Sequence, residues 1–516
     1  MDRILILDFG GQTTQLIGRR IRDFGVYSDI APGDADLSEY LHDGVKGIIL
    51  SGSPESSWKQ GSPEPDKAVF ACGLPVLGIC YGFHRLTISG GGEVKPLPHE
   101  EYGRSAVNRR GENPLFKGIP GKFASWMSHG DSVAVLGKDY ELIAESENGV
   151  PAAAAHISKP YWGVQFHPEV SHCEYGVELL ENFSCGICGA SKEWTLEQYI
   201  QEESSALREK AAGRDVLLLI SGGVDSTVAA ALLLKALPRE SIWLMYIDTG
   251  MMRKGESEEV AENLKALGAE NLLLIDAGKR FLEPLEGVSD PEKKRKIIGD
   301  VFIQVQEEEV AKLLPDGYLL AQGTLYTDLI ESGQGVGKKA QLIKSHHNVG
   351  TPLVKAKRKA GELIEPLDKL YKDEVRRLGE LLGVAADIVH RHPFPGPGLA
   401  IRILSDITEA KLSILREADA IYISELRERG LYDQIWQAFS VLLPVRSVGV
   451  TGDAREYGYV LGLRAVVSRD GMTADVYDFP TKDLLEISAK ITNTVKEIGR
   501  VVYDISSKPP ATIEWE

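Results

Sequence analysis

Short apolar runs alternate with amphipathic stretches over the first 190 residues. The runs are rich in β-branched residues and short enough to be buried strands: Arg3–Asp8, Val45–Leu50, Pro75–Cys80 and Tyr161–Phe166. Strands that alternate with helices are typical of an α/β domain with a largely parallel core sheet. We therefore predict a first α/β domain over residues 1–190.

A second alternating pattern follows a polar, acidic stretch at Trp194–Arg208, which we expect to be helical. Asp215–Ile220 predicts a buried strand, followed by a glycine-rich turn and a helix over Val228–Leu237. Further strands are predicted at Ser241–Asp248, Asn271–Asp276 and Gly317–Ala321. This order indicates the βαβ units of a doubly wound sheet, over residues 191–391.

The proline- and glycine-rich segment His392–Leu399 cannot continue a helix and marks a second boundary. Beyond it the pattern predicts two helical stretches, three strands and a last helix. The strands lie around Arg446–Val450, Tyr457–Val467 and Thr473–Tyr477, and the helix runs from about Lys482 to Arg500. The predicted fold is thus two successive α/β domains with largely parallel sheets, followed by a smaller α+β domain over residues 392–516.

Composition narrows the function classes. The 516 residues carry a net charge of −17, which disfavours nonspecific nucleic-acid binding, so a polyphosphate ligand would need a local site. We find neither an apolar run long enough to span a bilayer nor a secretory signal, and expect a cytoplasmic protein without membrane contact. Five cysteines do not form a disulfide framework in so long a chain.

One cysteine stands between two glycines, in Gly78-Ile-Cys80-Tyr-Gly82, where a predicted strand ends. A sharp strand-to-helix turn would lift the thiol above the sheet, and a helix N-terminus favours the thiolate. The alternative is a buried core cysteine. Downstream, the sequence supplies His167 and Glu169, in the order Gln-Phe-His-Pro-Glu. A histidine can act as base to a thiol and a carboxylate can orient that histidine, so the combination favours a catalytic triad.

Residues 1–190 resemble the class I glutamine amidotransferases, which release ammonia from glutamine through a γ-glutamyl thioester. The resemblance implies that Cys80 is the nucleophile, His167 the base and Glu169 the residue that orients His167. It also implies an oxyanion loop, whose backbone donors would come from Gly52, Ser53 and Tyr81.

Two positions depart from the amidotransferase pattern. Ser53 stands where the family's Gly-Gly-Pro has its second glycine, and His84 stands where the family has a glutamine near the bound substrate. We expect that His84→Gln would improve glutamine use, or at least not harm it.

A second glycine-rich loop follows the strand at Asp215–Ile220 and precedes a helix, which is the context of a phosphate-binding loop. An ordinary Gly-Gly turn with an aspartate cap is the alternative. The loop lacks the lysine of a Walker A motif, and Gly337-Lys338 has no preceding strand. The predicted ATP-binding residues are Ser221, Gly222, Gly223, Val224, Asp225, Ser226 and Thr227.

This loop resembles that of the ATP pyrophosphatases, which cleave ATP between its α- and β-phosphates. The resemblance implies ATP as co-substrate, with Mg²⁺ held in part by Asp225, and no organic prosthetic group.

Motifs over the rest of the chain resemble the glutamine-dependent GMP synthetase family. They are Lys293–Gly299, Gln322–Ser332, Lys344–Asn348, the segment 392–399, Leu443–Gly449 and Lys508–Glu516. The resemblance implies that XMP is adenylated and then aminated to GMP, with release of AMP and pyrophosphate. It also implies a homodimer formed by the C-terminal domain. The implied XMP-binding residues are Arg295, Gln437, Arg500, Lys508, Ile513 and Glu514.

Two other functions stay open on the sequence. One is an amidotransferase-pyrophosphatase that adenylates a carboxylate instead of XMP, which the C-terminal motifs disfavour. The other is a nucleotide-sensing module without turnover, which the complete triad and the complete phosphate loop disfavour.

Overall fold

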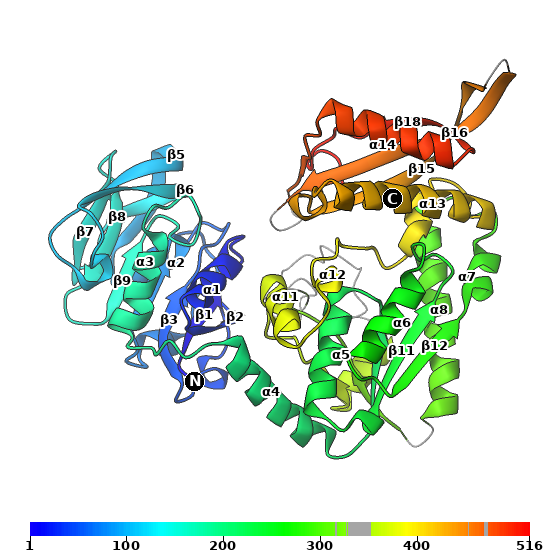
Figure 1. The fold of residues 1–516 in the computed structure, drawn as a ribbon. Coiled ribbons are helices and arrows are strands. Elements are labelled where there is room, and N and C mark those ends of the chain that lie inside the picture. The colour runs from blue at the N-terminus through cyan, green and yellow to red at the C-terminus, as the bar shows by residue number, and fades with distance from the viewer. Residues whose placement is uncertain (315–316, 327, 329–351, 452–453, 469–472) are drawn as a thin grey trace. The chain divides into compact units, whose positions relative to one another are not determined.

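The computed structural model describes the chain except residues 315–316, 327, 329–351, 452–453 and 469–472 (Figure 1). The Lys344–Asn348 motif, Gly337-Lys338 and the part of the Gln322–Ser332 motif at residues 327 and 329–332 lie outside the described residues. The chain packs into two compact units, one built mainly from residues 1–199 and the other from residues 200–325 together with 350–516. Among the helices that the structure describes, none has the length and apolar character required to cross a membrane.

The first unit contains a mixed sheet with the strand order β2-β1-β3-β4-β9-β8-β7-β5-β6. Its parallel half consists of β2 (Tyr27–Pro32), β1 (Arg3–Asp8), β3 (Val45–Leu50), β4 (Val76–Ile79) and β9 (Tyr161–Val164). Its antiparallel half consists of β8 (Pro151–His156), β7 (Tyr140–Ser146), β5 (Glu93–Arg109) and β6 (Lys122–Val135).

Strands β1 and β3 are apolar on both faces because helices cover the parallel half of this sheet, among them α1 (Thr14–Asp23), α2 (Tyr81–Ser89) and α3 (Gly176–Glu181). The predicted α/β class is confirmed, and all four strand candidates fall in this half. The antiparallel half, which sequence reasoning did not single out, extends the sheet beyond β9.

The second unit contains two sheets. The first has the order β12-β11-β10-β13-β14 and is parallel throughout, as predicted for a doubly wound fold. Its strands are β10 (Val216–Ile220), β11 (Ile242–Asp248), β12 (Asn271–Asp276), β13 (Leu319–Ala321) and β14 (Leu363–Ile364). The helix α4 (Leu196–Ala211) precedes this sheet in the chain. The helices of the same segment include α5 (Val224–Ala236), α6 (Glu256–Ala266), α8 (Pro291–Leu313), α11 (Lys372–Leu381) and α12 (Ala386–Val389) (Figure 1).

The C-terminal sheet joins β15 (Gln437–Thr451), β16 (Ala454–Val467) and β17 (Asp475–Val476) in antiparallel fashion, and β18 (Ile498–Tyr503) pairs parallel with β16. Helices α13 (Glu409–Glu428) and α14 (Thr481–Thr494) accompany it (Figure 1). The predicted α+β character is confirmed.

Where two helical stretches were expected, the structure has one α-helix, α13, and short 3-10 helices at Gly398–Arg402 and Tyr432–Gln434. One detail of this C-terminal prediction was wrong. The last helix ends at Thr494, because Val495 adopts an extended conformation and the following residues, Ile-Gly-Arg-Val-Val-Tyr, bond to β16 as strand β18. Arg500 therefore lies on a strand and not on a helix.

One hydrophobic core connects the two sheets of the second unit. It contains Leu217 and Met245 from the parallel sheet, Tyr422 from α13, and Ala438 and Leu461 from the C-terminal sheet. The predicted segments 191–391 and 392–516 thus share a compact unit, while each has its own sheet. The domain boundaries themselves stay a prediction.

His392, in the predicted boundary segment, joins this segment to the C-terminal sheet. Its ring stacks on Tyr432, with centroids 3.8 Å apart. Its Nε2 lies 2.9 Å from the Tyr432 carbonyl oxygen, and its Nδ1 accepts a hydrogen bond of 3.1 Å from the Ala438 N–H. The ring must therefore be neutral, with its proton on Nε2. Burial lowers the pKa of His392 to about 4, which agrees with this tautomer.

We expect His392 to make the second unit sensitive to acid. An unfolded histidine takes up its proton near pH 6.5, whereas the folded ring resists protonation down to about pH 4. The stability is therefore complete above about pH 6.5 and falls as the pH drops toward 4, by about 3 kcal/mol at most. Urea unfolding at several pH values should show a weaker decline for His392→Gln than for the wild type. Exposed His42 supplies the control, since His42→Gln should leave the decline unchanged.

Candidate active sites

Cys80 occupies a strained turn between β4 and α2. Its backbone has φ 53° and ψ −104°, a region that side chains other than glycine rarely adopt. The turn is tightly packed, since a Cβ on Gly78 would lie 2.4 Å from the Gly82 carbonyl carbon, and one on Gly82 would lie 2.2 Å from the Leu50 oxygen. Only glycines fit at both positions. The structure thus has the nucleophile-elbow geometry predicted for this cysteine.

His167 and Glu169 form a buried pair in the same unit. The His167 Nδ1 lies 2.7 Å from a Glu169 carboxylate oxygen, and the Glu169 side chain is fully buried. Burial alone would lower the pKa of His167, but Glu169 and the adjacent Cys80 together raise it well above its ordinary value. A protonated imidazole beside Cys80 favours the thiolate, which is the reactive form.

The predicted oxyanion loop lies against this pair. A Cβ on Gly52 would come within 3.4 Å of the His167 Cε1, so the loop backbone approaches the ring. The Gly82 N–H donates to the Ser51 carbonyl at 3.1 Å, which fixes the loop to the elbow. Tyr81 is the first residue of α2, so its N–H has no partner within the helix. Its side chain is buried, and its hydroxyl donates to the Pro63 carbonyl.

The second predicted loop connects β10 to the N-terminus of α5, as expected for phosphate binding. Gly222 has φ +77°, and a Cβ there would come within 2.8 Å of Val260. The hydroxyls are held by contacts inside the loop, since Ser226 and Thr227 both donate to the Gly223 carbonyl, at 3.2 and 2.9 Å. The loop is thus preformed, with helix N–H groups at its end.

Two basic side chains that the sequence analysis did not single out contact this loop. The Lys372 ammonium, at the start of α11, lies 2.6 Å from both carboxylate oxygens of Asp225. Arg391 donates to the Gly222 carbonyl at 3.1 Å and pairs with buried Glu256 at 2.5 Å. Nothing in the sequence distinguishes these cations from other basic residues, because only the fold brings them to a loop about 150 residues earlier.

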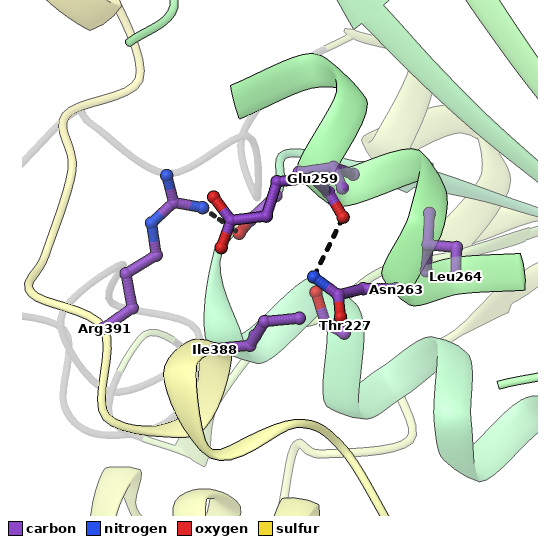
Figure 2. A pocket seen from close by; sticks show the side chains of 8 residues that line it. Thr227, Glu259, Asn263, Leu264, Ile388 and Arg391 are labelled. Atoms are coloured by element: carbon purple, nitrogen blue, oxygen red, sulfur yellow. Dashed lines mark hydrogen bonds between the residues drawn. The ribbon is translucent and has the colours of Figure 1, made fainter. Parts of the chain in front are cut away.

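A small pocket lies beside the loop (Figure 2). It is lined by Gly222, Thr227, Glu259, Val260, Asn263, Leu264, Ile388 and Arg391. Figure 2 shows the Arg391 side chain on one side of this pocket and Thr227 of α5 on another. The phosphate loop and the cation Arg391 therefore border one concave surface.

The predicted XMP residues are brought together only in part. Gln437 donates to the Glu514 carboxylate at 2.8 Å, and Ile513 is buried against Phe439 and Val441. Arg295 donates to the backbone oxygen of Glu516 at 2.7 Å. Lys508 pairs through its backbone with Ala474. Arg500 is exposed on β18, and within the described part of the chain no hydrogen bond or ion pair joins it to the others.

A buried arginine that the sequence did not single out binds this C-terminal cluster. Arg402, whose side chain is fully buried, contacts the Glu514 carboxylate at 2.9 and 3.2 Å. Arg402 also lies over the Phe439 ring, 4.2 Å from its centroid. Glu514 is therefore held by Arg402 as well as by Gln437.

Comparisons with known proteins identify the family of the chain. Residues 5–186 match the family "Glutamine amidotransferase class-I", and residues 424–515 match "GMP synthase C terminal domain". The chain is 49% identical over 517 residues to the glutamine-hydrolysing GMP synthase of Lactobacillus gasseri, covering 100% of this chain and 98% of that protein. It is 50% identical over 515 residues to the corresponding enzyme of Bacillus velezensis, covering 100% and 99%.

The chain belongs to the glutamine-hydrolysing GMP synthase family. The resemblance expected from the motifs is thereby confirmed. Among solved structures, a glutamine amidotransferase of Thermotoga maritima matches 40% of this chain and 85% of its own, with 17% identity and a TM-score of 0.27. A score this low supports no conclusion about this chain.

The Mg²⁺ expected from the sequence stays a prediction, with Asp225 as the residue expected to share in holding it. A carboxylate suits this ion, which binds through one or two carboxylates and the substrate phosphates. In the described residues, no group of three or more histidine, cysteine or acidic side chains is arranged as a metal site. The donor set therefore fits an ion that arrives with ATP, and it gives no sign of a protein-built metal cage.

Proposed function

We propose that this GMP synthase family member cleaves glutamine at Cys80 and uses the ammonia to convert XMP to GMP at the phosphate loop. The main support for glutamine cleavage is the strained turn at Cys80 next to the buried His167–Glu169 pair. The loop between β10 and α5 supports the second half of the proposal. Identity to GMP synthases over the full length favours XMP over a carboxylate as acceptor, and turnover over mere nucleotide sensing.

At the first site, the Cys80 sulfur attacks the side-chain carbonyl carbon of glutamine, and His167 accepts the thiol proton. The resulting oxyanion would be held by backbone N–H groups of Tyr81 and of the loop at Gly52 and Ser53. His167 then donates its proton to the leaving ammonia. Water hydrolyses the thioester to glutamate and restores the thiol. Glu169 keeps the imidazole oriented and balances its positive charge.

At the second site, the O2 atom of XMP attacks the α-phosphate of ATP, and pyrophosphate leaves. Ammonia then attacks C2 of the adenylated purine, and AMP leaves. The N-terminus of α5 and the ammonium of Lys372, which contacts Asp225 of this helix, would stabilise the pyrophosphate. Mg²⁺ bound with ATP would neutralise phosphate charge, with Asp225 as a ligand.

We place XMP against the C-terminal cluster, with Gln437, Ile513 and Glu514 as the residues that support this assignment most directly. Arg402 and Gln437 fix the Glu514 carboxylate, so a hydrogen bond from the ligand would meet an acceptor that is already oriented. Arg295, Arg500 and Lys508 are cations suited to the 5′-phosphate. Their geometry alone would not have suggested one site.

We also infer a homodimer through the C-terminal sheet, and a cytoplasmic location. Val448 of β15 and Tyr457 of β16 are register partners, and their side chains are 46% and 64% exposed. Neighbouring Val445 is 55% exposed. Adjacent exposed apolar side chains favour contact with another protein surface. Sedimentation velocity should show a dimer that Tyr457→Lys weakens; a monomer at micromolar concentration would contradict the inference.

Replacing the thiol separates the two activities. Cys80→Ala should abolish GMP formation from glutamine, because no thioester can form. Synthesis from added ammonium salts should remain near the wild-type rate. The measurement is GMP formation from XMP and ATP with either nitrogen source. Cys72, a free cysteine of the same unit, gives the control, since Cys72→Ala should retain both activities. Loss of ammonium-driven synthesis in a folded Cys80→Ala protein would refute the two-site assignment.

The phosphate loop is tested through Asp225. Asp225→Ala should reduce AMP and pyrophosphate formation at least tenfold, because it removes an oxygen ligand for Mg²⁺ and the partner of Lys372. Alkylation of Cys80 by a glutamine analogue should continue at the wild-type rate. The control is Asp387→Ala, an exposed carboxylate of α12. Release of ADP and phosphate by the wild type would overturn the pyrophosphatase chemistry, whatever the variants do.

A further inference from the structure

His84 is buried one helical turn after Cys80, where the sequence led us to expect a residue near the bound substrate. Its backbone N–H donates to the Cys80 carbonyl at 3.2 Å, and only 4% of the residue is exposed. Its Nε2 lies 2.8 Å from the side-chain oxygen of Gln165, which is fully buried. The Gln165 amide nitrogen in turn lies 3.7 Å from the Cys80 sulfur. The three side chains form a continuous hydrogen-bonded row.

The charge of the sulfur determines which groups donate and which accept along this row of hydrogen bonds. A thiolate only accepts hydrogen bonds, so the Gln165 amide must present its N–H to the sulfur. Its carbonyl oxygen then faces His84 and needs a donor there. The Nε2–H tautomer of His84 supplies it. If the amide turned over, a carbonyl oxygen would face the thiolate, and the two would repel each other.

The His84 ring is neutral in this arrangement. Burial lowers the pKa of His84 to about 4, and the charge of His129 acts in the same direction, while Gln165 and Asp131 oppose it. A neutral ring whose Nε2–H is engaged by a carbonyl is not a general base for the thiol. It leaves that role to His167, whose pKa is raised.

We propose that His84 is a positioning residue that holds the Gln165 amide with its N–H toward the Cys80 sulfur, and so stabilises the thiolate. The proposal rests on Cys80 as the glutaminase nucleophile. It assigns a function to Gln165, the residue two positions before His167, and it explains how a histidine serves at a position where related amidotransferases have glutamine. A glutamine at 84 also ends in an ε-nitrogen with N–H groups, so it can donate to the same carbonyl.

A double-mutant cycle tests whether His84 acts through Gln165. Gln165→Leu should lower kcat/KM for glutamine about tenfold, the effect of losing one hydrogen bond to a charged group. His84→Leu should cause a similar loss, because the Gln165 amide is then no longer held toward the thiolate. They should slow alkylation of Cys80 by iodoacetamide to a similar extent. In the Gln165→Leu background, His84→Leu should cause no further loss. His84→Gln should retain at least the wild-type kcat/KM, because it restores the donor.

Two controls separate this function from a structural one. Thr87→Val changes a buried side chain of the same helix, whose hydroxyl has no hydrogen-bond partner among the described residues, and it should leave both rates unchanged. Ammonium-driven GMP synthesis should be unaffected in every variant.

The outcomes distinguish the proposals. Equal losses from His84→Leu in both backgrounds, or wild-type alkylation in His84→Leu, would overturn the positioning function of His84. Failure of His84→Gln to recover activity would do the same. The assignment of Cys80 as the nucleophile is tested separately. It would fail if Cys80→Ala retained glutamine-driven synthesis, whatever the His84 variants show.

Discussion

Both candidate sites depend on the same constraint, a sharp turn from a buried parallel strand into a helix. At Cys80 the turn is held by close backbone approaches at Gly78 and Gly82, where no Cβ fits. At Gly222 the turn requires a positive φ, and a Cβ would come within 2.8 Å of Val260. Parallel strands end at one edge of a sheet, and the helices that follow point their N-termini to that edge. The fold thus places helix N-termini beside Cys80 in one unit and beside the predicted phosphate loop in the other.

The C-terminal tail is fixed by buried cations and not by a large apolar surface. Lys294, fully buried, binds the Glu516 carboxylate at 2.7 Å and the Ile403 carbonyl at 2.7 Å. Arg464, also fully buried, donates to four tail carbonyls, those of Asp504, Ser506, Thr512 and Ile513. A buried cation needs such partners, because an unpaired one costs several kcal/mol. The tail therefore cannot leave without exposing unsatisfied charge, which makes it a rigid support for a ligand.

Local sequence was informative where one segment determines its own structure. The apolar strands of both parallel sheets, the elbow glycines and the phosphate loop all lie in short segments whose pattern is sufficient. Prediction from local sequence failed where a residue far away in the chain determines the structure or the contact. The predicted last helix continued to about Arg500, yet pairing with β16 makes Ile498–Tyr503 a strand. The partners Lys372 and Arg402 were missed because 147 and 112 residues separate them from Asp225 and Glu514. His84 was correctly noticed as a departure, but its partner Gln165 emerges only from the fold.

The two sites also differ in how they hold charge. The His167–Glu169 pair is almost completely buried, so its ionisation is set by fixed neighbours inside the protein. The Asp225–Lys372 pair is different, since the two side chains are 31% and 44% exposed. An exposed pair of this kind contributes about 0–1 kcal/mol, so it can be exchanged at little cost. In the proposed function, Mg²⁺ bound with ATP would take the carboxylate and the lysine would turn to the phosphates, so that both charges would have stronger partners. A local cation of this kind would offset the field of a chain with a net charge of −17, which repels a polyphosphate.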